Sequence, residues 1–266
     1  MDKIIEVWKE SLELLKKYPR TLVPFALVVL FETLALYILF LTPQRPVAAL
    51  LAPPVNRFFG EQYLHYPYNL FLLPKLFYYA QILIGASIGI LMTGMALGMI
   101  KDAHDGKKPR MLISFVYSLK HCLTLLGIWI VMFSLSYGTR KLFQMLPPDA
   151  ERSALIAIIS YFVALLPQIV FIYAMPSVII NNKTFIPAIR QGVVFFAKHF
   201  VLSLALVLVP ALIYLPVIAM NMSLPVLSSI FPPEIIVAIV GLGIAATCII
   251  DIFVTTSPAL VLLQKR

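Results

Sequence analysis

The sequence predicts an all-α, polytopic membrane protein with six transmembrane helices, arranged as three parallel two-helix repeats. Of the 266 residues, 61% are hydrophobic and only 12% are charged, whereas soluble domains carry about 25% charged residues. The order of the segments predicts the repeats. An amphipathic stretch, a lysine and two long apolar segments occur three times, at junctions that read LLKKY, SLKHC and FAKHF and align on Lys16, Lys120 and Lys198.

Each repeat is expected to begin with an amphipathic helix that lies on the cytoplasmic surface. In the first of these stretches Ile4, Trp8 and Leu15 fall on one helical stripe, while most of the charged residues fall elsewhere. A short helix with a tryptophan on its apolar side suits the membrane interface. The three stretches are Asp2 to Lys17, Met111 to Leu119 and Ile186 to Ala197.

Six apolar segments follow these stretches, and a helix of about 20 residues spans the roughly 30 Å of hydrocarbon in a bilayer. We expect Pro167 to interrupt the fourth segment, and Pro210 and Pro216 to bend the fifth. The predicted spans are Thr21 to Leu41, Leu76 to Ile100, Cys122 to Tyr137, a segment within Ser153 to Asn182, Phe200 to Met220, and Ile235 to Leu263.

The chain is predicted to form a single integral membrane domain over residues 1–266, with repeats at about 1–101, 102–183 and 184–266. The connection from Thr42 to Lys75 breaks the symmetry. It holds six prolines, and nine of the 22 residues from Phe58 to Tyr79 are Phe or Tyr. Because a free loop would not be this apolar, we expect this external insertion to lie in the outer interface or to fold over the bundle.

The distribution of Lys and Arg over the connections predicts the orientation. One side carries fifteen of these residues, and the other carries six, namely Arg45, Arg57, Lys75, Arg140, Lys141 and Arg152. The positive-inside rule therefore predicts that both termini are cytoplasmic and that the protein is integral to the cytoplasmic (inner) membrane. An even number of spans agrees with this orientation.

Several classes of function are not expected from the sequence. The net charge is +9, but the chain has no zinc knuckle, Gly-rich phosphate loop or long basic run, so no nucleic-acid partner is expected. No histidines share ligand spacing with a carboxylate or cysteine, so we expect no metal and no cofactor. Cys122 and Cys248 lie in apolar segments as small hydrophobes. No catalytic motif is evident, which predicts that the protein is not an enzyme.

Two acids inside the spans are the leading candidates for a polar site. Glu32 lies eleven residues into the first span, about 17 Å along the helix, and Asp251 lies inside the sixth. A charge at this depth costs roughly 3 kcal/mol or more. The acids form either a shared proton or cation site, or separate structural hydrogen bonds. Gln168 is the third candidate, because carbonyls freed beside Pro167 are able to coordinate an ion.

The second span carries two glycine pairs, and small residues of this spacing let helices approach closely. Packing within the monomer or in a dimer is the favoured interpretation, and a glycine-lined pathway for a substrate is the alternative. The two pairs are Gly85 with Gly89, and Gly94 with Gly98.

Basic residues at the three repeat junctions are the candidate contacts for lipid headgroups at the inner surface. The alternative is that they only orient the protein and extend their charges to the interface. They are Lys16, Lys17, Lys120, His121, Lys198 and His199.

The chain resembles the multi-pass membrane domain associated with some glycerophosphodiester phosphodiesterases, and related stand-alone bacterial integral membrane proteins. The resemblance rests on LKKYP from Leu15 to Pro19, on the two Lys-His junctions, and on INNKTFIPAIRQGVVFFAKHF from Ile180 to Phe200. It extends over nearly the whole chain. It implies a membrane domain without the soluble phosphodiesterase domain, and it assigns no function to individual residues.

Two functions are consistent with the sequence. The first is a non-enzymatic membrane module that interacts with lipids, with a partner protein or with further copies of itself. The second is a small transporter or permease that uses Glu32 and Asp251. A cavity lined by both acids would favour the transporter, whereas a sealed bundle with a lipid-facing groove would favour the module.

Overall fold

The computed structural model describes residues 2–145 and 153–264, and every regular element in these two ranges is a helix. Six helical segments there are long and apolar enough to cross a membrane, which confirms the predicted class at the level of length and composition. They are Pro19–Phe40, Tyr68–His104, Cys122–Phe143, Ile158–Asn181, Phe200–Met222 and Ile235–Leu263.

Most of these segments are built from more than one helical element. The first combines η1 (Pro19–Leu22) with α2 (Val23–Phe40), and the third and sixth are the single helices α7 (Cys122–Gln144) and α14 (Ile235–Leu263). The elements of the other three are α4 (Tyr68–Ile84), η3 (Gly85–Gly89) and α5 (Ile90–His104); α8 (Ser153–Phe171) and α9 (Ala174–Asn181); and α11 (Phe200–Ala211), η4 (Leu212–Tyr214) and α12 (Leu215–Met222).

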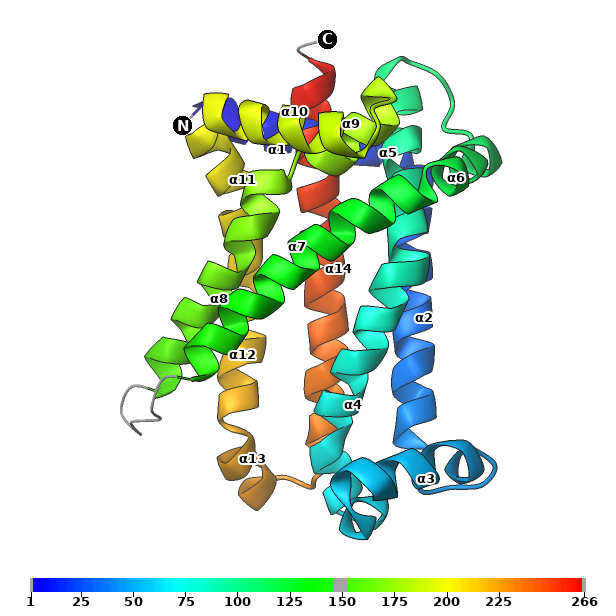
Figure 1. Cartoon of the computed structure of the whole chain (residues 1–266), viewed down its shortest axis with the longest axis vertical. Helices are drawn as coiled ribbons and strands as arrows, with labels where there is room; N and C mark the ends of the chain where they lie inside the picture. The colour runs from blue at the N-terminus through cyan, green and yellow to red at the C-terminus, as the bar shows by residue number, and fades with distance from the viewer. Residues whose placement is uncertain (1, 146–152, 265–266) are drawn as a thin grey trace.

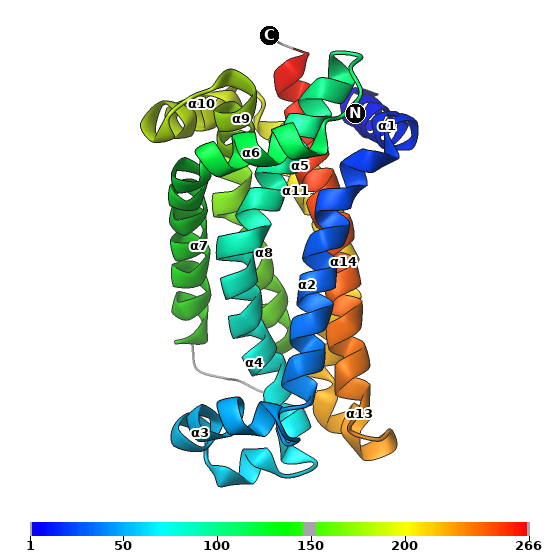
Figure 2. The same ribbon diagram turned by 90° about the vertical axis from the view of Figure 1, so that its right-hand side faces the viewer.

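Three further helices lie across one end of the bundle, as both views show (Figures 1 and 2). They are α1 (Asp2–Lys17), α6 (Met111–Lys120) and α10 (Phe185–Lys198). Each covers one of the predicted amphipathic stretches and ends at, or one residue beyond, the aligned lysine of its junction. We call this end of the molecule the α1 end. The opposite end, the α3 end, carries α3 (Val47–Phe59), η2 (Glu61–Leu64) and α13 (Leu224–Ile230).

The tightest packing lies towards the α1 end, around the last two turns of α14. All eight residues from Thr256 to Leu263 are buried. Leu260 packs with residues of α5, α7 and α9, and Val261 packs with residues of α1, α8 and α11. A helix that is buried on all sides belongs in a core, so this segment is the axis around which the other helices are arranged.

Helix α1 docks on this segment through a buried polar contact. The hydroxyls of Ser11 and Ser257 lie 3.1 Å apart and share a hydrogen bond, and both residues are fully buried. The Ser11 hydroxyl also lies 2.7 Å from the Val7 carbonyl, to which it donates. Gln264 donates a further hydrogen bond to Glu10. The buried hydroxyls of both serines are thus partnered where α1 packs on the core.

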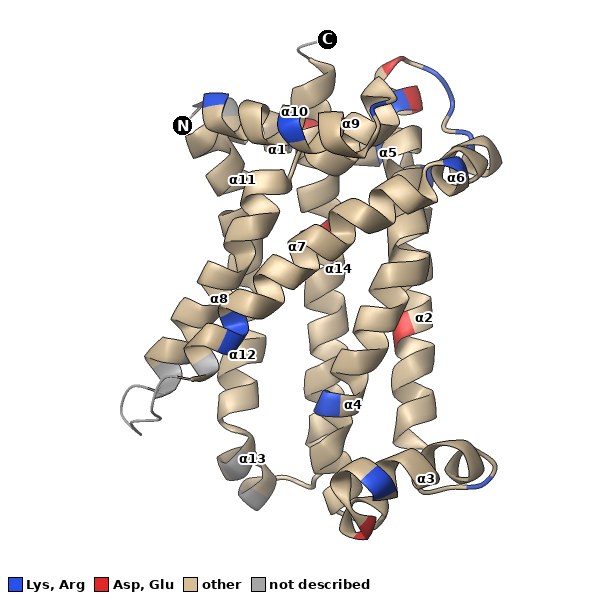
Figure 3. Cartoon of the chain, viewed as in Figure 1, with Lys and Arg blue, Asp and Glu red and all other residues tan. Residues whose placement is uncertain are grey.

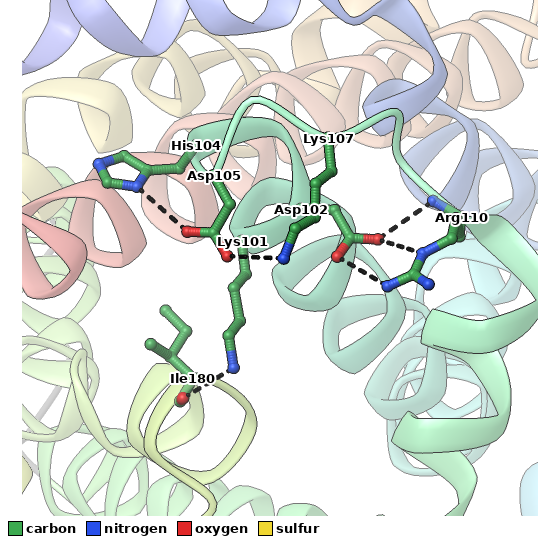
Figure 4. A network of polar contacts seen from close by, with 7 residues as sticks. All are labelled: Lys101, Asp102, His104, Asp105, Lys107, Arg110 and Ile180. Atoms are coloured by element: carbon green, nitrogen blue, oxygen red, sulfur yellow. Dashed lines mark hydrogen bonds and ion pairs between the residues drawn. The ribbon is translucent and has the colours of Figure 1, made fainter.

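Polar contacts at the α1 end fix the turn between α5 and α6 (Figure 4). The Arg110 guanidinium donates to both Asp102 carboxylate oxygens, at 3.2 and 3.4 Å, and these hydrogen bonds raise the pKa of Arg110 above its usual value. The Lys101 ammonium donates to the Ile180 carbonyl near the end of α9, at 3.1 Å. These contacts therefore join the end of α5 both to the start of α6 and to α9.

The predicted interruption at Pro167 is wrong in its position. Helix α8 continues past Pro167, and the break falls at residues 172–173, between α8 and α9. This break lies four residues before Pro176, whose ring would collide with the Ile172 carbonyl in a continuous helix. In the fifth span, the α-helical pattern gives way to η4 between Pro210 and Pro216, the two prolines that were predicted to bend it.

Two predicted boundaries also change. The third span is longer than expected, because α7 continues from Tyr137 to Gln144. The insertion 42–75 is largely helical, and its last part, from Tyr68, belongs to a segment of 37 residues. At 1.5 Å per residue that segment is about 55 Å long, so it exceeds the hydrocarbon thickness and reaches well beyond it.

Lys and Arg gather at the α1 end, and fewer lie towards the α3 end (Figure 3). This distribution follows the two sets that the sequence analysis assigned to opposite sides. Arg152, Lys265 and Arg266, which were counted in those sets, lie outside the described residues.

Close packing of α5 on α6 yields the first testable prediction. A Cβ atom added at Gly94 would lie 2.2 Å from the Ser118 hydroxyl, which donates to the Leu91 carbonyl at 2.9 Å. Gly94→Ala should therefore displace Ser118, break that bond and destabilise the fold by about 1–3 kcal/mol. Thermal unfolding in detergent measures the effect as a lower Tm.

The matched control is Gly241→Ala on α14, where nothing lies within 4 Å of the added atom. This control should leave Tm unchanged or raise it slightly, because alanine favours helices. Equal Tm values for the two variants would contradict the packing described between α5 and α6.

Candidate functional site

A cavity of about 250 Å³ lies inside the bundle, and both predicted intramembrane acids line it. Its wall is formed by α2, η3, α5, α7, α8, α9 and α14, so five of the six spans contribute to it. The Gln168 side chain lines it as well. Its polar wall residues are Glu32, Thr93, Gln168, Thr247, Cys248, Asp251 and Thr255.

Glu32 is the one charged residue of α2. Its neighbours Leu30, Phe31 and Leu34 are exposed on the outside of the bundle, whereas Glu32 is half-buried and lines the cavity. The Gln81 side-chain amide on α4 donates a hydrogen bond to a Glu32 carboxylate oxygen at 3.3 Å. The helix thus presents an apolar face outwards and its acid inwards, as an acid in a span requires.

Asp251 lies on the face of α14 that points into the cavity. Three neighbours of Asp251 in the sequence, Thr247, Cys248 and Thr255, line the same cavity. Each is three or four residues away from Asp251, and this spacing places side chains on one helical face. The Thr247 hydroxyl donates to the Gly243 carbonyl at 2.8 Å. Within the described part of the chain, no side chain makes a hydrogen bond or ion pair with the Asp251 carboxylate, although its side chain is accessible.

The two carboxyl groups border the same cavity. None of the described residues that line the cavity is Lys or Arg. A cleft lined by charges of one sign, with apolar walls, concentrates ions of the opposite sign. The cavity therefore places two acidic side chains, and no basic one among its described residues, inside an otherwise apolar bundle.

Gln168 reaches the cavity from the last turn of α8, close to the break before α9. The break itself borders the cavity, since Ile172, Met175 and Pro176 belong to its wall. The expected interruption at Pro167, directly beside Gln168, is wrong, and the break lies four to five residues beyond Gln168, before Pro176.

The glycine pairs of the second span separate into two roles. Gly85 and Gly89 bound the π-helical segment η3 and line the cavity. Gly94 and Gly98 instead pack on α6, where added Cβ atoms would meet Ser118 and Ser114 at 2.2 and 3.0 Å. Short π segments often occur at functional sites, so the position of η3 beside the acids supports a functional cavity.

The remaining wall is aromatic and rich in thioethers. Trp129 lines the cavity from α7 and stacks on Phe133, with ring centroids 5.0 Å apart. Sequence reasoning missed this wall because its members are apolar residues scattered over five elements, with no spacing that distinguishes them from ordinary packing. Gln81 was missed as well, although an amide in an apolar run is a detectable signal. The aromatic and Met residues of the wall are Phe25, Trp129, Phe171, Met92, Met132 and Met175.

The predicted headgroup contacts all lie at the α1 end, away from the cavity. The junction lysines Lys16, Lys17, Lys120 and Lys198 are exposed. His121 is instead held within the protein, because its two ring nitrogens lie 3.0 Å from the Tyr117 carbonyl and 2.9 Å from the Asn182 side-chain oxygen. The His199 ring contacts Phe195, with centroids 4.9 Å apart.

Comparison with protein-family models, with curated proteins and with solved structures found no match to this chain. The resemblance to the membrane domain of certain phosphodiesterases therefore stays a prediction.

Proposed function

We propose that this protein is a small membrane carrier that binds a cation in the central cavity and exchanges it for protons. The observation that carries the proposal is the convergence of Glu32 and Asp251, from the first and last spans, on one cavity without a basic residue in its described wall. A bound cation would neutralise charges that are otherwise unfavourable inside a membrane. The proposal assigns the protein no enzymatic role.

The orientation belongs to the same proposal. We infer that the α1 end, with its excess of Lys and Arg, faces the cytoplasm, and that the protein resides in the inner membrane. The three units, each an amphipathic helix followed by a helical hairpin, are then parallel repeats with one orientation.

A second candidate function is that of a lipid-binding module, and a specific observation favours it. On α6, Leu112, Ile113 and Leu119 are at least half exposed, next to the exposed Lys120. On α10, Ile186 is 73% exposed. Amphipathic helices with apolar and basic surfaces of this kind bind anionic membranes. The same surfaces would also accept a partner protein or a second copy of the chain.

The carrier proposal predicts the effect of removing the two acids. The double variant Glu32→Gln/Asp251→Asn should bind cations roughly 10- to 100-fold more weakly, because two charged acceptors are lost. The measurement is thermal stabilisation of the protein in nanodiscs by Na⁺, K⁺ and small ammonium ions. The control Glu61→Gln makes the same chemical change on the exposed η2 segment at the α3 end and should retain wild-type binding.

Failure of every cation in the panel to stabilise the wild type more than the double variant would contradict the proposal. Loss of stabilisation in Glu61→Gln as well would show that the effect comes from net charge and not from the cavity.

The carrier proposal also predicts that cation binding depends on pH. Protons compete with the cation for the same carboxylates, so cation affinity should fall as the pH is lowered, and the residual binding of the double variant should not depend on pH. The other titratable groups near the two acids are the Cys248 thiol and the Tyr214 phenol. Thiols and phenols are ordinarily uncharged at neutral pH. Arg140 is the charged group nearest in influence to Tyr214. Cation titrations at several pH values test this expectation, and a pH-independent wild type would contradict the exchange of cation for proton.

The lipid candidate makes a separate prediction. Lys120→Gln/Lys198→Gln should lose part of its thermal stabilisation by phosphatidylglycerol relative to phosphatidylcholine nanodiscs, since each basic residue near an anionic surface is worth about 1 kcal/mol. The matched control is Lys75→Gln/Lys141→Gln, which removes two exposed lysines from outside the α1 end. Equal losses in both variants would contradict a lipid surface confined to the α1 end.

A further inference from the structure

We infer that the cation bound in the cavity is a small primary amine with an apolar body, an inference that rests on the carrier function proposed above. The residues that line the cavity are of two chemical kinds. Oxygen acceptors are supplied by Glu32, Gln168 and Asp251, and apolar and aromatic surface is supplied by Phe25, Trp129 and Phe171. A ligand that satisfies both walls has a charged donor at one end and hydrocarbon at the other.

The acceptor wall suits an ammonium group that carries N–H bonds. A primary ammonium has three donors, and the acids and the glutamine side chain offer at least that many acceptor oxygens. The Asp251 carboxylate has no partner within the described part of the chain, so it is available to accept. Charge-assisted hydrogen bonds of this kind are about twice as strong as neutral ones.

The aromatic wall suits the rest of such a ligand. Cations near aromatic rings gain a favourable interaction with the ring electrons, and the gain increases when the site excludes water. Methionine side chains, here Met92, Met132 and Met175, are flexible and fill irregular space around an apolar group. A fully hydrated inorganic ion would gain little from these surfaces.

A metal ion fits this wall poorly. Within the described residues, no group of three or more His, Cys, Asp or Glu side chains is placed to hold a metal. Hard cations such as Ca²⁺ take six to eight oxygen ligands, whereas the wall here combines two acids with aromatic and thioether groups. An anion is opposed by both carboxylates.

The size of the cavity limits the ligand. Its volume of about 250 Å³ lies just below the range of about 300–1,000 Å³ that is usual for pockets of drug-sized molecules. An amine with a single ring or a short alkyl chain is therefore the size class that the cavity admits.

The experiment measures binding of radiolabelled phenethylamine to the full chain in nanodiscs, with phenethyl alcohol as an uncharged competitor of similar shape and with Na⁺ and K⁺ as inorganic competitors. The wild type should bind the amine, and the alcohol should compete at least 10-fold more weakly than unlabelled amine. Glu32→Gln/Asp251→Asn should lose at least 10-fold in affinity. Trp129→Leu should lose about 3- to 30-fold, while Glu61→Gln should match the wild type.

The outcomes separate this inference from the function on which it rests. Binding of Na⁺ or K⁺ in an acid-dependent way without amine binding would overturn the amine inference and leave the carrier function standing. Absence of binding by every cation would overturn both. Equal competition by phenethyl alcohol would overturn the amine inference, and this comparison uses only the wild type, so it does not depend on the folding of any variant. An unchanged affinity in Trp129→Leu would overturn the role of the aromatic wall.

Discussion

The structure depends on the burial of one short segment, the last two turns of α14. Lipid gives little hydrophobic drive for helices to associate, so close van der Waals packing must hold them together. From Thr256 to Leu263 every residue is enclosed by other helices, whereas Val254 and Thr255 border the cavity. The packed core therefore ends within one residue of the cavity. Because Asp251 lies about one turn further along the same helix, the core also fixes the position of this acid.

This division between a tight end and a hollow middle explains how polar groups persist in so apolar a chain. In the core, the small polar side chains of Ser11 and Ser257 are partnered with one another. The two acids are instead placed in the region where packing is incomplete, and Glu32 receives one amide donor from Gln81. A bundle packed to uniform density would have to bury both carboxyls without room for a counter-ion.

Much of the fold was predictable because helix length and composition in a membrane are set by the bilayer. The sixth span was located at the observed residues, Ile235 to Leu263. Glu32 and Asp251 were selected as charges in apolar runs, but their convergence depends on packing between helices far apart in the sequence. The position of Trp129 in the cavity wall was not predictable for the same reason, because its spacing in the sequence resembles that of any core residue. The break at residues 172–173 was misplaced because the effect of a proline falls four residues upstream, and the relevant proline was Pro176.

The π-helical segment η3 gives the second span a property that its hydropathy does not reveal. A π segment holds one residue more than the α-helical path requires, and each residue of an α-helix turns it by about 100°. Because a π-helix turns less per residue than an α-helix, the segment Gly85–Gly89 absorbs its extra residue, and α4 keeps nearly the phase that it would have without that residue. Gln81 on α4 therefore still faces Glu32. If the same residues formed a regular α-helix instead, α4 would rotate against α5 by about 100°, and Gln81 would turn away from the acid although the span would stay equally apolar. In related chains, loss of one residue here would preserve the contact between the amide and the acid, whereas loss of the π geometry alone would break it.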